Sequence, residues 1–65
     1  MGVTSRLHDL RHERSWTQAD LARHVGVSRQ TVNSIETGRF EPSLSLALKL
    51  AALFEVRVED IFSLR

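Results

Sequence analysis

Four polar side chains near the middle of the chain have the chemistry to hydrogen-bond a ligand: Arg29, Gln30, Asn33 and Ser34. An arginine side chain donates two parallel hydrogen bonds, and the side-chain amides of Gln30 and Asn33 both donate and accept. At helical spacing the four residues fall near one face, whereas Val32 and Ile35 fall on the opposite face. A helix over this segment would therefore have one buried side and one hydrogen-bonding side.

Residue types that support catalysis or metal binding are few. His8 and His12 are four residues apart, which suits zinc binding on a helix, but His24 lies elsewhere in the chain. The chain has no cysteine, and neither an HExxH motif nor a carboxylate cluster completes a metal site. It also lacks a paired nucleophile and base, a carboxylate dyad and a glycine-rich phosphate loop. We therefore expect no enzyme activity, no metal and no cofactor.

Length and charge predict a single small domain over residues 1–65. A chain of 65 residues is too short for two cores and leaves little room for an enclosed pocket, so we expect no small-molecule ligand. No apolar run reaches the ~18 residues of a membrane span, and the lack of cysteine is typical of a cytoplasmic protein.

The formal net charge is only +1, but residues 1–40 contain six arginines and four acidic residues. The positive excess is modest and N-terminal.

Helix signals cover nearly the whole chain, and we expect an all-α fold of five helices without a sheet. The first helix is predicted over about residues 4–14. Thr17 caps the second helix, with Asp20 in capping-box position, and Gly26 provides the turn that follows it. Ser28 caps a third helix that runs to about residue 37, and Ser43 caps a fourth that runs to about residue 54. A short fifth helix is predicted at about residues 58–62.

The second and third helices have the spacing of a helix-turn-helix over about residues 17–37. Two helices of roughly two turns flank the glycine, and their inward positions are apolar: Leu21, Ala22, Val25, Val27, Val32 and Ile35. The small Ala22 allows the two helices to cross closely, because a larger side chain would hold them apart. The capping, turn and core residues thus agree on one arrangement.

Motifs along almost the whole chain resemble those of one family. They are Arg11, Trp16-Thr17-Gln18, Leu21-Ala22, Gly26-Val27-Ser28-Arg29-Gln30-Thr31, Ile35-Glu36, Gly38, Pro42-Ser43-Leu44 and Val58-Glu59-Asp60-Ile61-Phe62. This pattern resembles the Cro and lambda-repressor type of helix-turn-helix, the xenobiotic response element (XRE) family, and its small single-domain bacterial members. The resemblance implies a compact five-helix, lambda-repressor-like DNA-binding domain that regulates transcription.

The resemblance also implies roles for individual residues. It places the third helix in the major groove of DNA, with Arg29, Gln30, Asn33 and Ser34 as base-reading candidates. Arginine can bond guanine through two hydrogen bonds, and glutamine or asparagine can bond adenine in the same way. Gln18 matches the family position where the start of the second helix meets a phosphate. Further candidates for phosphate contact are Arg14, Thr17, Arg23, Thr31, Thr37 and Arg39. A solvated polar face is the simpler alternative for the third helix.

Arg11 and Glu36 match family positions that form an ion pair between the first helix and the end of the third. We expect this pair to be structural, because a partly buried bidentate pair positions elements more than it adds stability.

The fourth helix is apolar nearly all round, since only Ser45 and Lys49 are polar along its length. A bundle of this size cannot enclose such a helix completely, which indicates a shared surface. We expect a twofold homodimer through about residues 43–65, with interface candidates Leu44, Leu48, Phe54, Val56 and Phe62. The pattern does not separate core from interface here.

These features together predict a regulator that binds double-stranded DNA sequence-specifically, as a dimeric repressor on a pseudo-palindromic operator. The alternative is a protein-interaction module, such as an adaptor or an antitoxin, on the same fold. The polar third helix favours DNA, because protein interfaces prefer aromatic and aliphatic anchors.

Overall fold

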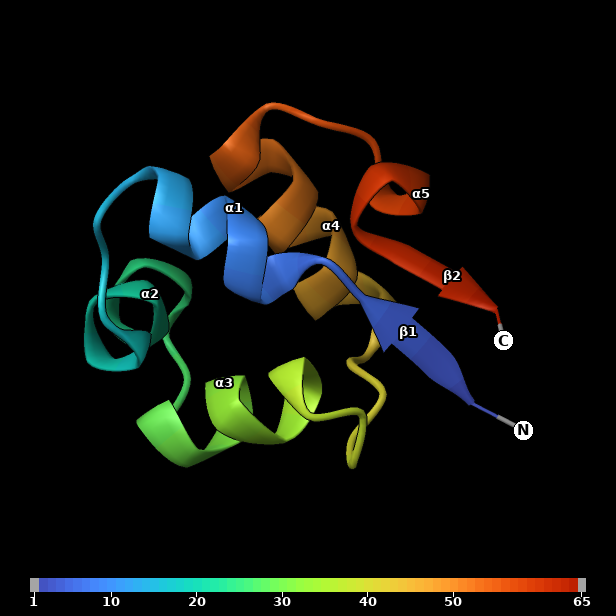
Figure 1. The fold of residues 1–65 in the computed structure, drawn as a ribbon, viewed down its shortest axis with the longest axis horizontal. Coiled ribbons are helices and arrows are strands. Elements are labelled where there is room, and N and C mark those ends of the chain that lie inside the picture. Colours follow the sequence, from blue (N-terminus) through green and yellow to red (C-terminus); the bar gives the residue numbers. More distant parts are fainter. Residues whose placement is uncertain (1, 65) are drawn as a thin grey trace.

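A computed structural model of the chain describes residues 2–64. Its elements in chain order are β1 (Val3–Ser5), α1 (Leu7–Glu13), α2 (Gln18–Val25), α3 (Arg29–Glu36), α4 (Leu44–Phe54), α5 (Val58–Ile61) and β2 (Phe62–Leu64). In Figure 1, α1 and α4 lie near the centre, α2 and α3 at the left and bottom, and α5 and the strands at the right. The predicted compact five-helix architecture is confirmed.

The helix starts follow from the capping residues in the sequence. The hydroxyl of Thr17 accepts a hydrogen bond from the Asp20 amide, and the Asp20 carboxylate accepts one from the Thr17 amide, which completes the expected capping box. Ser28 and Ser43 cap α3 and α4 in the same manner through their side-chain oxygens. Gly26 ends α2 with φ of 75°, a left-handed conformation that glycine adopts without strain. These local signals fix the helix-turn-helix.

The expectation of no sheet is wrong, because the two ends of the described chain form a small antiparallel ribbon. β1 pairs with β2 in the register Val3 with Leu64 and Ser5 with Phe62. The first helix therefore begins at Leu7 rather than near residue 4, and the fifth ends at Ile61. A backbone hydrogen bond of 2.8 Å from the amide of Arg6 to the carbonyl of Ile61 extends the connection beyond the strands.

One hydrophobic core joins the helices. Its buried residues come from every helix: Leu7, Leu21, Ala22, Val25, Val32, Ile35, Leu46, Leu50, Ala51, Phe54 and Ile61. Phe54 is only 6 % exposed, so its expected place in a dimer interface is corrected to the core of the single chain. Val56 and Phe62 are half-buried and pack against the core, whereas Leu44 and Leu48 are 73 % and 54 % exposed.

No helix within residues 2–64 combines the length and the apolar character that crossing a membrane requires.

Candidate nucleic-acid interface

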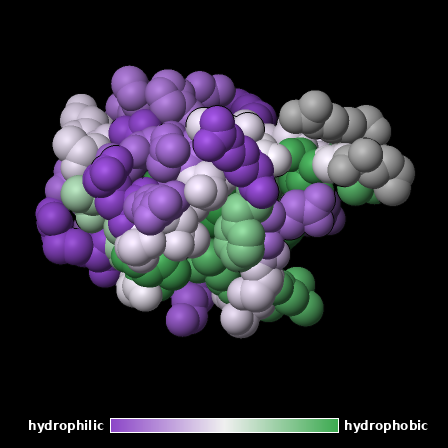
Figure 2. All heavy atoms as spheres, turned by 90° about the horizontal axis from the view of Figure 1, so that it is seen from below, coloured by the Kyte–Doolittle hydropathy of each residue, from purple (hydrophilic) through white to green (hydrophobic). Residues whose placement is uncertain are grey.

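The helix α3 lies at the lower edge of the molecule in Figure 1. One face of it is buried and the other is exposed. Val32 and Ile35 are 1 % and 2 % exposed because they belong to the hydrophobic core. Arg29 and Gln30 occupy the outer side and are exposed. Figure 2 views the molecule from the α3 side and shows hydrophilic side chains over much of this face, with hydrophobic ones toward one edge.

The four base-reading candidates are not equally accessible. Within the described part of the chain, no hydrogen bond or ion pair engages the side chains of Arg29 and Gln30. Asn33 and Ser34 are half-buried, and the side-chain oxygen of Asn33 already accepts a hydrogen bond from Gln18. Arg29 and Gln30 are therefore the side chains most able to reach a ligand.

Phe40 is a candidate contact that the sequence did not indicate. Its side chain is 47 % exposed, and it borders a shallow hollow of about 240 Å³ together with Ser28, Gln30, Thr31 and Ser34. The amide of Phe40 donates to the carbonyl of Ser34, which holds the loop against α3. The available signal was an aromatic residue in the short loop after the third predicted helix. An apolar side chain here could contact a thymine methyl group.

The start of α2 borders an open groove of about 610 Å³ that reaches the first residue of α3. Thr17, Gln18 and Arg29 all line it, so the structure brings two phosphate candidates and one base-reading candidate together. The N-terminal end of a helix carries partial positive charge from its unpaired amides. Asp20 opposes this charge locally. The amide of Thr17, followed by its hydroxyl, lowers the pKa of the Asp20 carboxyl below its ordinary value of 3.8.

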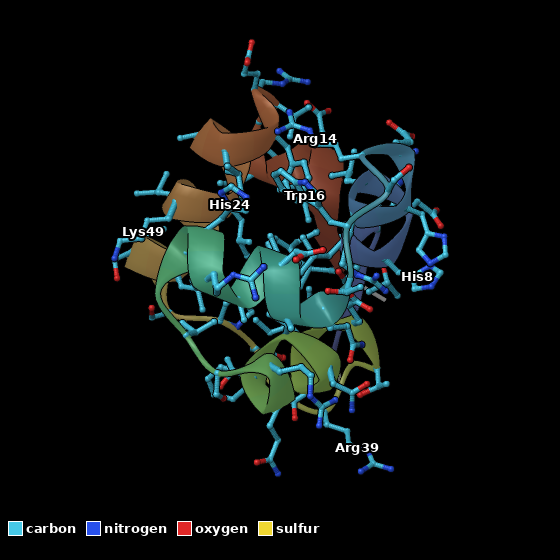
Figure 3. All side chains as sticks on the ribbon, turned by 90° about the vertical axis from the view of Figure 1, so that its left-hand side faces the viewer. His8, Arg14, Trp16, His24, Arg39 and Lys49 are labelled. Atoms are coloured by element: carbon cyan, nitrogen blue, oxygen red, sulfur yellow. The ribbon has the colours of Figure 1, made fainter. Side chains whose placement is uncertain are left out.

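Two arginines predicted to contact phosphate, Arg14 and Arg39, lie far apart in the structure (Figure 3). Figure 3 shows Arg39 beside α3, whereas Arg14 lies at the opposite end of the molecule near Trp16. The guanidinium carbon of Arg14 is 5.2 Å from the centre of the Trp16 ring and 4.9 Å from that of Phe54. At these distances a guanidinium is attracted to an aromatic face. Arg14 therefore covers aromatic core residues and does not lie on the α3 face.

The remaining phosphate candidates already have partners within the protein. The exposed Arg23 pairs with Asp20 on α2. The hydroxyl of Thr31 lies 2.9 Å from that of Ser28, and the hydroxyl of Thr37 donates to the carbonyl of Asn33 at 2.9 Å. The two hydroxyl contacts stabilise the two ends of α3.

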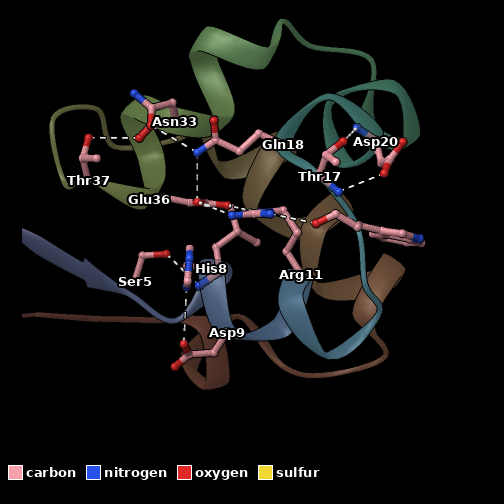
Figure 4. Close-up of polar contacts among 12 residues, drawn as sticks. Ser5, His8, Asp9, Arg11, Thr17, Gln18, Asp20, Asn33, Glu36 and Thr37 are labelled. Carbon is pink, nitrogen blue, oxygen red and sulfur yellow. Dashed lines mark hydrogen bonds and ion pairs between the residues drawn. The ribbon is translucent and has the colours of Figure 1, made fainter.

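Arg11 and Glu36 are in direct contact beneath α2 and α3. Nε of Arg11 donates to Oε2 of Glu36 at 2.7 Å, and Nη2 donates to Oε1 at 3.1 Å. The side chains are only 8 % and 4 % exposed, and Arg11 also donates to the carbonyl of Trp16 at 2.7 Å. Gln18 joins the same network, because its Nε2 donates to Oε1 of Glu36 (Figure 4). The pair links α1 to the end of α3.

The histidines do not converge on a common point. The rings of His8 and His12 lie 4.2 Å apart on α1, and Nδ1 of His8 lies 3.6 Å from a carboxylate oxygen of Asp9. His24 instead stacks on Trp16. Across residues 2–64, no three side chains of the metal-binding types gather into a site.

Known proteins share both the sequence pattern and the fold. The helix-turn-helix family matches residues 7–61. An uncharacterized HTH-type transcriptional regulator of Methanocaldococcus jannaschii is 59 % identical over 46 residues, which are 71 % of this chain and 70 % of that protein. The phage CTXphi transcriptional repressor RstR of Vibrio cholerae is 33 % identical over 60 residues, covering 92 % of this chain and 54 % of RstR.

A solved structure agrees with these sequence matches. The restriction-modification controller protein C.AhdI of Aeromonas hydrophila superposes with a TM-score of 0.75 at 33 % identity, covering 85 % of this chain and 80 % of that one. The chain belongs to the XRE-type helix-turn-helix family. It is a DNA-binding domain of a transcriptional regulator and not an enzyme.

Proposed function

We propose that this regulator inserts α3 into the major groove of DNA and represses transcription as a twofold homodimer on a pseudo-palindromic operator. The polarity of α3 carries the proposal. Its inner residues are almost fully buried, whereas Arg29 and Gln30 extend from the outer face without partners among residues 2–64. An exposed side chain with several hydrogen-bond donors at the start of a helix can bond the edge of a base in the major groove.

The chemistry of these two residues supports sequence-specific binding. Arg29 can donate two hydrogen bonds to O6 and N7 of guanine, and Gln30 can bond N6 and N7 of adenine. Phe40 and Ser34 lie beside Gln30 around the same hollow, where they can contact a neighbouring base pair. Specificity therefore comes from the first turn of α3 together with the loop that follows the helix.

Contacts to phosphate would fix the position of α3 on the duplex. The groove at the start of α2 adjoins Arg29 on one side, and Arg39 lies beside α3 (Figure 3). Backbone amides at a helix start and arginine side chains are both common phosphate partners. These contacts hold the duplex against α3 without selecting a sequence.

The exposed apolar surface of α4 supports the dimer. Leu44 and Leu48 lie one helical turn apart and are more than half exposed. Beside them is an open, mainly apolar hollow of about 290 Å³ lined by Val3, Glu41, Pro42, Leu44, Ala47, Val58 and Phe62. The described chain measures 29 × 23 × 20 Å, so two copies in contact can present their α3 helices one duplex turn, ~34 Å, apart.

Repression is favoured because one of the relatives, RstR, is named a transcriptional repressor. A dimer bound over a promoter would block polymerase by occupying the DNA. Such a protein would act in the cytoplasm, where it meets DNA.

Fluorescence anisotropy with duplex DNA at low and moderate salt tests the proposal. Affinity should fall steeply as salt rises, because arginine–phosphate contacts release counterions. Arg29→Ala should weaken binding strongly, whereas the matched control Arg14→Ala, which removes the same charge away from α3, should have a small effect. Equal losses for the two variants, or the absence of salt-dependent binding, would contradict the proposal.

A further inference from the structure

The side-chain amide of Gln18 contacts both Glu36 of the buried ion pair and Asn33 (Figure 4). Its Nε2 donates to Oδ1 of Asn33 and to Oε1 of Glu36, each at 3.1 Å. An amide nitrogen carries two hydrogens, and these two bonds use both of them. The Gln18 side chain therefore keeps no donor for a phosphate and offers only its Oε1.

The ion pair of Arg11 and Glu36 determines which group donates and which accepts in every hydrogen bond of this network. Arg11 can only donate, and the Glu36 carboxylate, which accepts two hydrogen bonds from Arg11, can only accept. Gln18 must then turn its amino group toward Glu36. The same amino group faces Asn33, so Asn33 must turn its oxygen inward and its amino group away from Gln18 (Figure 4).

The outward amino group of Asn33 is available for a ligand. Within residues 2–64 no hydrogen bond engages its Nδ2, and none of the unpaired polar side-chain atoms in this part of the chain is buried. An asparagine with both amide atoms available can pair with adenine by donating and accepting together. The oxygen of Asn33 faces Gln18 and accepts a hydrogen bond from it, so only the amino group is directed away from Gln18.

We propose that Glu36 and Gln18 fix Asn33 as a pure hydrogen-bond donor toward DNA, an inference that rests on the proposed function. Asn33 then contacts an acceptor, which is a phosphate oxygen, O6 or N7 of guanine, N7 of adenine, or O4 of thymine. It does not form the two-bond pair with adenine that its residue type suggests. Gln18 and Glu36 are positioning residues, since their side chains act on DNA through Asn33.

The substitution Glu36→Gln should reverse the network by changing a single atom. The new amide oxygen takes the place of Oε2 and keeps the shorter hydrogen bond from Nε of Arg11. The new amino group then takes the place of Oε1, where it faces Gln18 and loses the bond from Nη2 of Arg11. Gln18 then turns its oxygen inward and accepts from both neighbours, and Asn33 presents its carbonyl to DNA. A carbonyl prefers N6 of adenine or N4 of cytosine and is repelled by a phosphate.

Arg11→Lys is the matched control. It weakens the same ion pair, but it keeps a donor at residue 11 and the acceptor-only carboxylate at residue 36. The direction of the bonds through Gln18 is therefore unchanged. Both variants should lose stability, and only Glu36→Gln should change how Asn33 faces DNA.

The experiment compares wild type, Glu36→Gln and Arg11→Lys by selection of bound duplexes from random DNA, below the unfolding temperature of each. If Asn33 contacts a base, Glu36→Gln alone should shift the preference at one position of each half-site toward a base that presents an amino group, which is adenine or cytosine. If Asn33 contacts a phosphate, Glu36→Gln should bind about tenfold more weakly than Arg11→Lys with an unchanged sequence preference. Equal affinity and equal preference for the two variants would overturn the inference.

Hydrogen exchange of the side-chain amides by NMR, on the protein without DNA, provides a second readout. The Gln18 amino protons should exchange more slowly than those of Asn33 in wild type, and Glu36→Gln should remove this protection. Slow exchange at Asn33 with fast exchange at Gln18 would refute the bond directions. Failure of wild-type protein to bind duplex DNA would refute the proposed function instead, and this exchange pattern would still stand.

Discussion

Replacement of Glu36 by alanine should destabilise the fold through the buried cation that remains. Glu36 accepts two hydrogen bonds from Arg11 and one from Gln18, with its side chain only 4 % exposed. After the change, the carbonyl of Trp16 is the one remaining partner of Arg11 among these contacts. Removing one member of a buried pair costs ~3–5 kcal/mol, and the surviving bond places this case near 3.

A loss of this size is large for so small a domain. A chain of 65 residues has a free energy of unfolding of roughly 3–10 kcal/mol. A loss of about 3 kcal/mol corresponds to a fall of the melting temperature by roughly 12–24 °C. Guanidinium denaturation followed by circular dichroism measures the free energy, and a thermal scan measures the melting temperature.

A double variant distinguishes the effect of losing the ion pair from the effect of losing side-chain volume. Arg11→Met with Glu36→Leu replaces both charges by apolar groups of similar volume, and it should recover most of the lost stability. A loss below about 1 kcal/mol for Glu36→Ala would refute the reasoning, because a desolvated charge could not then remain unpaired. A double variant as unstable as Glu36→Ala would instead assign the effect to side-chain volume.

Three further changes test other parts of the structure. Asp20→Asn should flatten the dependence of stability on pH below about pH 4. The Thr17 amide lowers the pKa of the Asp20 carboxyl, so the stability that the ionised carboxylate contributes is lost as pH falls through the lowered value. Parallel pH profiles of the two proteins in thermal unfolding would argue against this. Ser28→Ala should cost about 1 kcal/mol by removing the bond from the Thr31 amide that caps α3, and an unchanged denaturation midpoint would count against that cap. Leu48→Asp should convert a dimer to a monomer in light scattering at micromolar concentration, and a retained dimer mass would exclude this face of α4.

Local signals in the sequence predicted the part of the fold that local interactions determine. Thr17, Ser28 and Ser43 each cap a helix, and Gly26 takes the left-handed conformation of the turn. Each of these features involves residues within a few positions of one another, so spacing alone can reveal it. The helix-turn-helix was predictable for the same reason.

Features that depend on distant residues were not predictable in this way. The strands β1 and β2 contain three residues each, and their pairing joins Val3 to Leu64 across the whole chain. Phe54 occupies an apolar helix face that could have been core or interface, and the arrangement of α4 against Trp16 places it inside. Periodicity reports which residues are apolar, but it does not report which neighbour covers them.

The candidate site shows the same limit. Residue types and the family resemblance indicated Gln18 and Asn33 as separate DNA contacts. In the structure the Gln18 amide donates to both Asn33 and Glu36, which changes what Gln18 and Asn33 can offer a ligand. The direction of a hydrogen bond depends on all partners in three dimensions, and spacing along one helix does not encode it.

Selection of bound sequences from random duplex DNA, with wild type, Arg29→Ala and Gln30→Ala, tests the central claim most directly. Wild type should enrich a pseudo-palindrome with half-sites one helical turn apart, ~10 base pairs. Each variant should relax the preference at its own base pair, at a cost of about 1–3 kcal/mol in discrimination. Enrichment of the same sequences by all three proteins, or of none, would contradict recognition of bases by α3.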